Sequence, residues 1–422
     1  MMNNVYLCID LKTFYASVEC VERGLDPFQA QLVVADKSRG NGSICLAVSP
    51  KMKALGVKNR CRLFEIPKEI EYIAAKPRMA LYIKYSADIY AIYLRYISKD
   101  DIHVYSIDEA FLDATKYLKL YRMTAFELAQ KIMNDIYKEI GITATCGIGT
   151  NLYLAKIALD ISAKHNKTNI SYLDEDTYKK TLWKHQPLTD FWRIGRGIAK
   201  RLNNIGIYDM EGIAKADDAV LKKIFGVDYV IIKDHANGIE PVKISDIKKY
   251  RSKEQSISQG QVLFEDYKYS EARLVVKEMT ELLSLELIDK HLVTNNISLY
   301  IGYSKDATDP TGGSKKISQT TNVYSILVEN VLELFDATTN KFLPIRRINI
   351  SFNNVKDELY EQLDLFTDYE NIKKERKLEQ TINDLKKKFG KNSILRGMNF
   401  EEKATTRKRN LLIGGHNSGE EE

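Results

Sequence analysis

This chain of 422 residues contains few cysteines and few histidines. Its six histidines are scattered, and no two of its five cysteines (Cys8, Cys20, Cys45, Cys61 and Cys146) form a Cys-x-x-Cys pair. The sequence therefore lacks the ligand spacing of a structural zinc site. An odd number of cysteines without paired spacing is typical of reduced thiols that pack as small apolar side chains.

Long apolar runs are also absent. No stretch of about 18 consecutive apolar residues occurs, so we expect no membrane-spanning helix. The chain passes from Met1 into the apolar segment 5–9 without a basic leader or a cleavage site. Together these absences predict a cytoplasmic protein.

Net charge is modest and unevenly distributed. The chain carries a formal charge of +6, and residues 11–79 hold 12 basic and 7 acidic side chains. Residues 244–355 hold 14 of each. Composition alone therefore does not identify a nucleic-acid-binding protein, and the functional class has to come from motifs.

The first half of the chain predicts a sheet with an insertion. Without residues 11–76, the elements follow the order β-α-β-β-α-β, with strands at 5–10, 103–106, 109–113 and 143–148 and helices at 77–96 and 122–140. This order is the ferredoxin-like pattern. A further helix is expected at 151–164. In this topology Asp10 and the turn at Asp108-Glu109 meet at one end of the sheet.

The second half predicts two more units. Residues 174–236 read as short helices broken by glycines, and residues 237–253 read as a linker. A compact α+β unit follows, with strands at 257–263, 293–303, 317–323 and 345–353 and helices at 271–289 and 325–336. After Val355 the chain becomes more polar and its packing signal fades. The fold class is therefore α+β multidomain.

The most informative segment is Ser106-Ile107-Asp108-Glu109-Ala110-Phe111-Leu112-Asp113. Neighbouring residues of a strand point to opposite faces, so two adjacent acids disrupt packing unless a tight turn directs both to a cation. Asp10 ends another apolar run. Three hard oxygen ligands favour Mg²⁺, and two such ions can support phosphoryl transfer. The alternative is an exposed turn with unrelated acids.

Three segments are suited to phosphate. The backbone N–H groups of Thr13, Phe14 and Tyr15 begin the helix that follows Asp10, where free donors favour phosphate oxygens. Lys53 and Lys156 lie near the starts of two other helices and can neutralise a triphosphate. For Tyr15 the alternative is core packing, and for each lysine it is a solvated surface position.

The segment Trp192-Arg193-Ile194-Gly195-Arg196-Gly197-Ile198-Ala199-Lys200-Arg201-Leu202 matches the helix-hairpin-helix pattern. Its glycines let the N–H groups near Gly195, Gly197 and Ile198 approach a DNA phosphate, and Lys200 adds charge. Such a contact holds the DNA backbone without reading its sequence. The alternative is an ordinary glycine-containing turn between helices.

The polar tail contains Gln362-Leu363-Asp364-Leu365-Phe366. The apolar side chains of this pentapeptide (Leu363, Leu365 and Phe366) could anchor the tail in the groove of a partner protein. The alternative is a segment folded back onto the body of the chain.

These motifs resemble the Y family of translesion DNA polymerases, in its Gram-positive UvrX-like branch related to UmuC and DNA polymerase IV. The resemblance covers about residues 1–415 and is strongest in "CIDLKTFYASVE", "ALGVK", "YSIDEAFLD", "AKIA" and "WRIGRGIAKRLNNIGI". It implies a palm (1–10 and 77–165), fingers (11–76), a helical thumb (166–236), a linker (237–253), a little finger (254–355) and a tail (356–422).

The resemblance also implies roles for single residues. Asp10, Asp108 and Glu109, with the Leu11 carbonyl, would hold two Mg²⁺ ions, and Tyr15 would be the steric gate that rejects a ribose. Thr13, Phe14, Tyr15, Lys53 and Lys156 would bind the dNTP, and Gln362, Leu363, Leu365 and Phe366 would bind a sliding clamp. The chain departs from the family pattern at Lys12, Pro50 and Leu152.

The expected activity is error-prone, DNA-templated synthesis past lesions by a monomer that binds primer-template DNA and dNTP. The fingers span only 66 residues, and no further acid cluster suggests a proofreading nuclease, so low fidelity is expected. Two other readings are open. One is a catalytically weak DNA-binding accessory protein, and the other is a nucleotidyl cyclase, which would share the palm and the metal chemistry.

Overall fold

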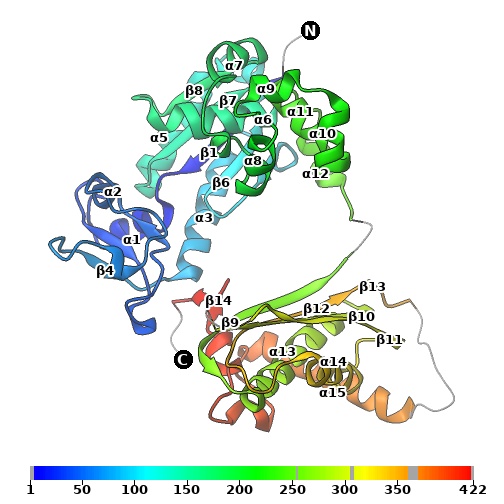
Figure 1. Cartoon of the computed structure of the whole chain (residues 1–422). Helices are drawn as coiled ribbons and strands as arrows, with labels where there is room; N and C mark the ends of the chain where they lie inside the picture. The colour runs from blue at the N-terminus through cyan, green and yellow to red at the C-terminus, as the bar shows by residue number, and fades with distance from the viewer. Residues whose placement is uncertain (1–3, 253–254, 305–307, 360–368, 420–422) are drawn as a thin grey trace. The chain divides into compact units, whose positions relative to one another are not determined.

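The structure is a computed structural model that describes residues 4–252, 255–304, 308–359 and 369–419. The chain divides into two compact units, Met1–Tyr250 and Arg251–Glu422 (Figure 1). None of the helices in these described ranges is both long and apolar enough to cross a membrane.

The predicted palm contains a five-stranded sheet of order β5-β6-β1-β7-β8. Its strands are β1 (Tyr6–Leu11), β5 (Ile102–Val104), β6 (Glu109–Asp113), β7 (Ala144–Gly149) and β8 (Ile170–Leu173). The predicted ferredoxin-like order is confirmed by β1, β5, β6 and β7. The fifth strand, β8, pairs in parallel with β7 and lies beyond the boundary predicted at residue 165.

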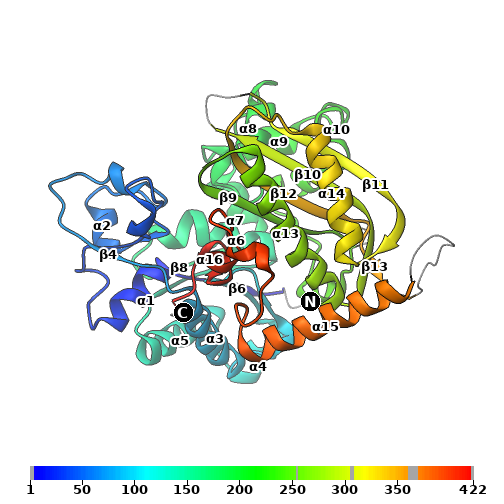
Figure 2. The ribbon, with the colours of Figure 1, turned by 90° about the horizontal axis from the view of Figure 1, so that it is seen from below.

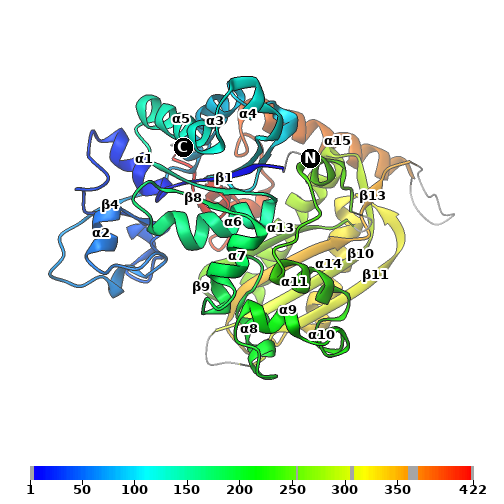
Figure 3. The same cartoon turned by 90° about the horizontal axis from the view of Figure 1, so that it is seen from above.

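Helices cover both faces of this sheet. Figure 3 shows α3 (Met79–Leu94) and α5 (Ala125–Ile140) on one side of β1 and β8, with α6 (Leu152–Ile157) on the other. The short helix α4 (Thr115–Tyr121) precedes α5. A capping box formed by Thr124 and Glu127 starts α5, and Gly141, with φ +77°, ends it.

The predicted fingers contain a small three-stranded sheet of order β3-β2-β4. Its strands are β2 (Leu32–Val34), β3 (Ala47–Val48) and β4 (Ile73–Ala75), and α1 (Phe14–Glu22) and α2 (Pro50–Ala54) accompany them. Its core consists of small and medium apolar side chains from the strands and loops, namely Val33, Ala35, Cys45, Val48, Met52, Val57, Leu63 and Ile66.

The predicted thumb is a cluster of short helices around one apolar core. They are α7 (Glu175–Leu182), α8 (Arg196–Asn203), α9 (Met210–Lys215), α10 (Asp218–Phe225) and α11 (Tyr229–Ala236). The predicted linker 237–253 differs from the structure, because α12 (Ile244–Lys249) lies within it. Ile244 is 2% exposed and packs with Tyr6, Cys8 and Phe111, so this helix is docked on the palm.

The second unit confirms the predicted order of strands and helices. It contains β9 (Ile257–Tyr267), α13 (Tyr269–Asp289), β10 (Leu292–Tyr303), β11 (Thr311–Thr321), α14 (Tyr324–Thr338) and β12 (Ile345–Asn353). The sheet order is β11-β10-β12-β9, and β13 (Lys356–Asp357) pairs with β10. Seen from below in Figure 2, α13 and α14 lie in front of the sheet, on its single helix-covered face.

The predicted loss of packing after Val355 is wrong for the described part of the tail. It forms α15 (Tyr369–Phe389), α16 (Thr406–Asn410) and the hairpin β14 (Leu412–Ile413)–β15 (His416–Asn417). The buried carboxylate of Glu278 on α13 accepts hydrogen bonds from Asn399 Nδ2 at 2.9 Å and from the Thr405 amide at 2.7 Å. This anchor is polar, so apolar periodicity could not reveal it.

Helix α6 lies unusually close to β7. A Cβ atom added at Gly147 would lie 2.1 Å from the Ala155 carbonyl oxygen, and one at Gly149 would lie 2.2 Å from the Ala155 nitrogen. After α6 the chain continues through a π-helical turn, Ala158–Ser162. Only glycine permits this approach, which brings the side chains of α6 and the π turn over the edge of β1.

We predict that Gly147→Ala destabilises the first unit by roughly 1–3 kcal/mol, because backbone must move to admit the methyl group. Urea denaturation followed by circular dichroism measures this change. Gly197→Ala is the matched control, because an added Cβ there meets nothing within 4 Å. Equal stability of the two variants would contradict the close-packing account.

Candidate active site

The three predicted acids meet at the end of β1. Asp10 and Glu109 are direct cross-strand partners in the antiparallel pair β1–β6. The Leu11 amide donates to the Asp108 carbonyl oxygen at 2.9 Å, which fixes the Asp108 backbone beside the end of β1. Ser106 Oγ donates to Asp108 Oδ1 at 2.7 Å. The tight turn expected from the sequence therefore brings all three carboxylates to one edge of the sheet.

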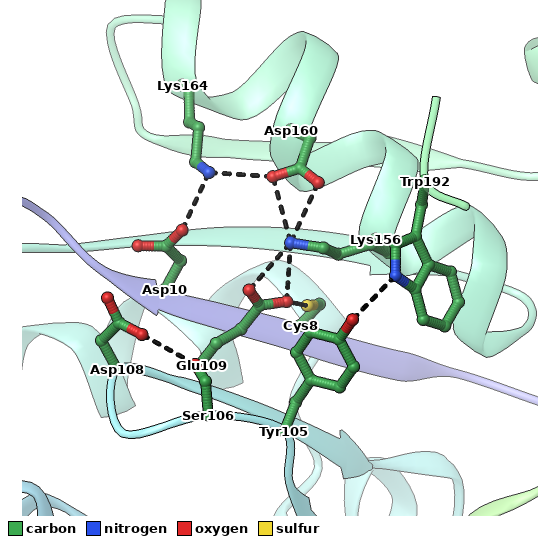
Figure 4. A network of polar contacts seen from close by, with 10 residues as sticks. All are labelled: Cys8, Asp10, Tyr105, Ser106, Asp108, Glu109, Lys156, Asp160, Lys164 and Trp192. Atoms are coloured by element: carbon green, nitrogen blue, oxygen red, sulfur yellow. Dashed lines mark hydrogen bonds and ion pairs between the residues drawn. The ribbon is translucent and has the colours of Figure 1, made fainter. Parts of the chain in front are cut away.

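Two lysines from the helical segments that follow β7 form ion pairs with two of these acids (Figure 4). Lys156 Nζ lies 2.8 Å from Glu109 Oε1 and 2.9 Å from Asp160 Oδ2. Lys164 Nζ lies 2.8 Å from both Asp10 Oδ2 and Asp160 Oδ1. Asp160 thus bridges the two lysines, and each lysine holds one acid of the predicted metal site.

Burial raises the pKa of Asp10 and of Glu109, and the facing Lys164 and Lys156 ammonium groups oppose that rise. Burial disfavours the charge of both lysines, but their carboxylate partners hold the pKa of each above its ordinary value. The lysines are therefore charged at neutral pH and act as cations on the carboxylates.

The carboxylates of this site are the type of ligand that a hard divalent cation prefers, but they do not converge on one point. Among the residues that the structure describes, no three Asp, Glu, His or Cys side chains converge closely enough to hold a metal ion. Lys164 holds Asp10 and Lys156 holds Glu109 instead. The two ammonium groups supply the positive charge beside Asp10 and Glu109. A metal ion that bound these two acids would have to displace the lysines.

The helix that follows β1 presents the predicted phosphate-binding groups. Thr13 is the N-cap of α1 in the left-handed conformation, with φ +47°, and Phe14 is the first helical residue. Tyr15 is half-buried, and burial together with Asp108 raises its pKa.

Tyr15 is held in place by residues that the sequence analysis did not identify. Its ring stacks on Tyr82 of α3, with centroids 4.6 Å apart and planes at 19°. Tyr82 donates its hydroxyl hydrogen to buried Glu19 at 2.7 Å, and Arg78 donates to the same carboxylate at 2.9 Å. Glu19 follows Tyr15 by four residues on the same helix, a spacing that could have indicated this support.

The two predicted triphosphate lysines lie in different environments. Lys53 on α2 is exposed, and burial of its stem lowers its pKa while Asp10 opposes that shift and Lys164 adds to it. Lys156 is only 6% exposed and is engaged by two carboxylates. Lys164, whose side chain is 37% exposed, is the more accessible cation of the pair. It follows Lys156 by eight residues, and that helical spacing was a signal the sequence analysis did not use.

The three departures from the family pattern have local structural roles. Lys12 Nζ donates to Asn169 Oδ1, which ties the end of β1 to the loop before β8. Pro50 is the first residue of α2, where its missing N–H costs nothing. Leu152 is 3% exposed in the core beside Ala155. None of them disturbs the three acids.

The hairpin motif lies at the start of α8. Gly195 is its N-cap, and Gly195, Gly197 and Lys200 are exposed. A single 3₁₀ turn, Leu188–Asp190, precedes this segment where the pattern expects a first full helix. Neither glycine has a positive φ, and an added Cβ at either would meet nothing within 4 Å. The fold therefore does not require glycine at these two positions.

Trp192 connects this segment to the acidic turn. Its Nε1 donates to the Tyr105 hydroxyl at 3.1 Å, and the two rings pack edge to face at 5.9 Å (Figure 4). The Tyr105 amide in turn donates to the Glu109 carbonyl oxygen at 2.9 Å.

The predicted pentapeptide Gln362–Phe366 lies outside the residues that the structure describes.

Two family models match the chain. The model of the impB/mucB/samB family matches residues 9–160, and that of the impB/mucB/samB family C-terminal domain matches residues 254–365. The first range contains all three acids, Tyr15, Lys53 and Lys156. The second covers the sheet of the C-terminal unit.

Curated relatives align over almost the whole chain. UvrX of Bacillus subtilis (strain 168), a protein named for UV-damage repair, is 35% identical over 98% of this chain and 97% of its own length. DNA polymerase IV 2 of the same organism is 32% identical over 99% of both chains. The relatives thus extend across both units and the tail.

Solved structures share the fold. A Y-family DNA polymerase chimera of Dbh and Dpo4 superposes with a TM-score of 0.62 at 22% identity, covering 84% of this chain and 99% of its own. The Dbh DNA polymerase in an insertion ternary complex gives a TM-score of 0.53 at 22% identity, with 84% and 99% covered. With the relatives at 35% and 32% identity, these matches show that the chain belongs to the impB/mucB/samB family and is a UvrX-like DNA polymerase of the Y family.

Proposed function

We propose that this polymerase extends a primer on a DNA template, by attack of the primer 3′-hydroxyl on the α-phosphate of a dNTP, and that it does so past damaged bases. The observation that carries the proposal is the cross-strand pair of Asp10 and Glu109, with Asp108 fixed beside Leu11. Relatives named for UV-damage repair and as DNA polymerase IV support the reaction, and a neighbour titled as a ternary complex supports the substrates.

We infer that Asp10, Asp108 and Glu109, with the Leu11 carbonyl, hold two Mg²⁺ ions. Ions bound there would lower the pKa of the attacking hydroxyl and offset the charge on the departing pyrophosphate. The carboxylates provide hard oxygen ligands, and the two lysines currently provide the compensating charge. Release of Lys164 from Asp10 would free both a ligand for the ion and a cation for the nucleotide.

The nucleotide would then lie between α1 and the lysines. The free N–H groups at Thr13, Phe14 and Tyr15 suit phosphate oxygens, and the exposed ammonium of Lys53 suits the triphosphate. Lys164 suits it better than Lys156, because Lys156 is buried between Glu109 and Asp160. In this arrangement the Lys156 ion pairs position Glu109, and Lys164 contacts the substrate.

DNA would be held by the start of α8. Gly195, Gly197 and Ile198 lie at the start of α8, an added Cβ at either glycine would meet nothing within 4 Å, and Lys200 is exposed nearby. Since the fold does not require these glycines, close approach of a phosphate backbone explains them.

We further propose that Gln362, Leu363, Leu365 and Phe366 bind a sliding clamp, which would raise the local concentration of the monomeric enzyme at the primer end.

Low fidelity follows from the size of the fingers. The β3-β2-β4 sheet and two short helices form the whole fingers unit, so few side chains can enclose the nascent base pair. Weak shape selection lowers the penalty for insertion opposite a damaged base. This property is what damage tolerance requires.

We predict that Asp108→Ala lowers the rate of primer extension by at least about a thousandfold, because it removes several kcal/mol of charge stabilisation at the reacting phosphate. Primer extension opposite an undamaged base and an abasic site measures the rate, and fluorescence anisotropy shows that DNA binding is retained. The exposed acid variant Asp100→Ala is the control and should extend normally. Near-normal extension by Asp108→Ala would reject the proposed site, whereas DNA binding without extension by the wild type would favour a DNA-binding accessory role.

We predict that Tyr15→Ala lowers the preference for dNTP over rNTP by at least about tenfold, because the ring that meets the 2′-hydroxyl is lost. Single-nucleotide insertion kinetics with dCTP and rCTP measure the preference. Tyr15→Phe keeps the ring stacked on Tyr82 and should keep the discrimination. An unchanged preference in Tyr15→Ala would limit this residue to packing.

A further inference from the structure

Two loops of the fingers lie side by side and form one exposed surface. Residues 36–43 and 58–64 are joined by hydrogen bonds from the Leu63 amide to Ser43 O at 3.0 Å and from the Phe64 amide to Asn41 O at 3.1 Å. Arg62 Nη1 also donates to the Gly42 carbonyl oxygen at 2.5 Å. We call these two loops the fingers platform.

The platform is strongly basic. The two loops contain five basic residues and one acidic residue. The acidic residue is Asp36, and the basic residues are Lys37, Arg39, Lys58, Arg60 and Arg62. Asp36 forms its ion pair with Arg39 at 3.4 Å. Lys58, Arg60 and Arg62 are exposed. Most of the excess positive charge of residues 11–79 is therefore gathered here.

An aromatic ring stands among these cations. Phe64 is 64% exposed, whereas its neighbours Leu63 and Ile66 are each 5% exposed and enter the core of the fingers. The short 3₁₀ helix Leu63–Glu65 holds the Phe64 side chain on the outer side of the loop. Exposure of a large ring beside buried apolar neighbours costs solvation free energy, which a ligand that covers the ring would recover.

The backbone of the platform is also constrained. Arg60 has φ +60°, a left-handed conformation that costs a residue with a Cβ about 1 kcal/mol. The Cys61 amide donates to the Lys58 carbonyl oxygen at 3.3 Å and the Cys45 amide donates to the Cys61 carbonyl oxygen at 2.8 Å, which closes this turn against the segment before β3. The turn thus presents Lys58, Arg60 and Arg62 in a fixed arrangement.

We propose that the fingers platform binds the single-stranded template ahead of the primer terminus. Phe64 would stack on an unpaired base, and Lys58, Arg60 and Arg62 would contact the phosphates that flank it. Exposed aromatics among basic side chains are the usual means of holding single strands, and a duplex would hide the base faces that the ring needs. An acidic peptide would use the charge but offers no planar face to Phe64. The inference rests on the proposed polymerase function.

The test compares primer-templates whose 5′ template overhang is either 1 or 10 nucleotides, with fluorescence anisotropy of the full chain as the measurement. Wild type should bind the long overhang at least about fivefold more tightly. The double variant Phe64→Ala/Arg60→Ala should lose that gain, keep wild-type affinity for the short overhang and extend the short template normally. The affinity of this variant for the long overhang should also depend less on salt concentration, because a phosphate contact is removed.

The matched control is Phe126→Ala/Lys138→Ala on α5 of the palm, where Phe126 is 45% exposed and Lys138 is exposed. It should behave as wild type with both overhangs. If the platform variant keeps the gain from the long overhang, or loses affinity for both overhangs equally, the platform does not bind the single strand. Binding of a polyglutamate peptide in place of the overhang would also overturn the proposal. Failure of wild type to extend any template would instead reject the polymerase function itself.

Discussion

Two carboxylates, Asp10 and Glu109, face each other across β1 and β6, and both are largely buried. Each carboxylate disfavours the ionised form of the other, and burial disfavours both ionised forms further. Lys156 and Lys164 offset it, with Asp160 between them. The lysines reach the acids because Gly147 and Gly149 let the following helix lie directly on β7. Sheet register, glycine positions and helix placement therefore serve one electrostatic requirement.

The same arrangement explains how closely spaced carboxylates are tolerated in the folded chain. The network contains four carboxylates, counting Asp108, and two ammonium groups, so it retains negative charge where a metal ion would enter. Asp108 accepts a hydrogen bond from Ser106. A π-helical turn carries Asp160, and such turns interrupt helices at functional sites.

The sequence predicted the local patterns well and the polar anchors poorly. The order of strands and helices in both units and the convergence of Asp10 with Asp108-Glu109 followed from apolar periodicity and turn chemistry. Strand β8 and helix α12 were not predicted, because each is short and its packing depends on distant partners such as Tyr6. The tail was mistaken for unpacked chain because a buried glutamate, Glu278, holds it through hydrogen bonds.

Metal binding tests the central claim most directly, namely that the lysines stand where divalent cations bind. Mn²⁺ affinity measured by electron paramagnetic resonance, without DNA or nucleotide, compares wild type with Lys164→Met and Asp10→Asn. The account predicts tighter binding in Lys164→Met, because the competing ammonium on Asp10 is removed, and weaker binding in Asp10→Asn. Equal affinity in all three proteins would contradict it.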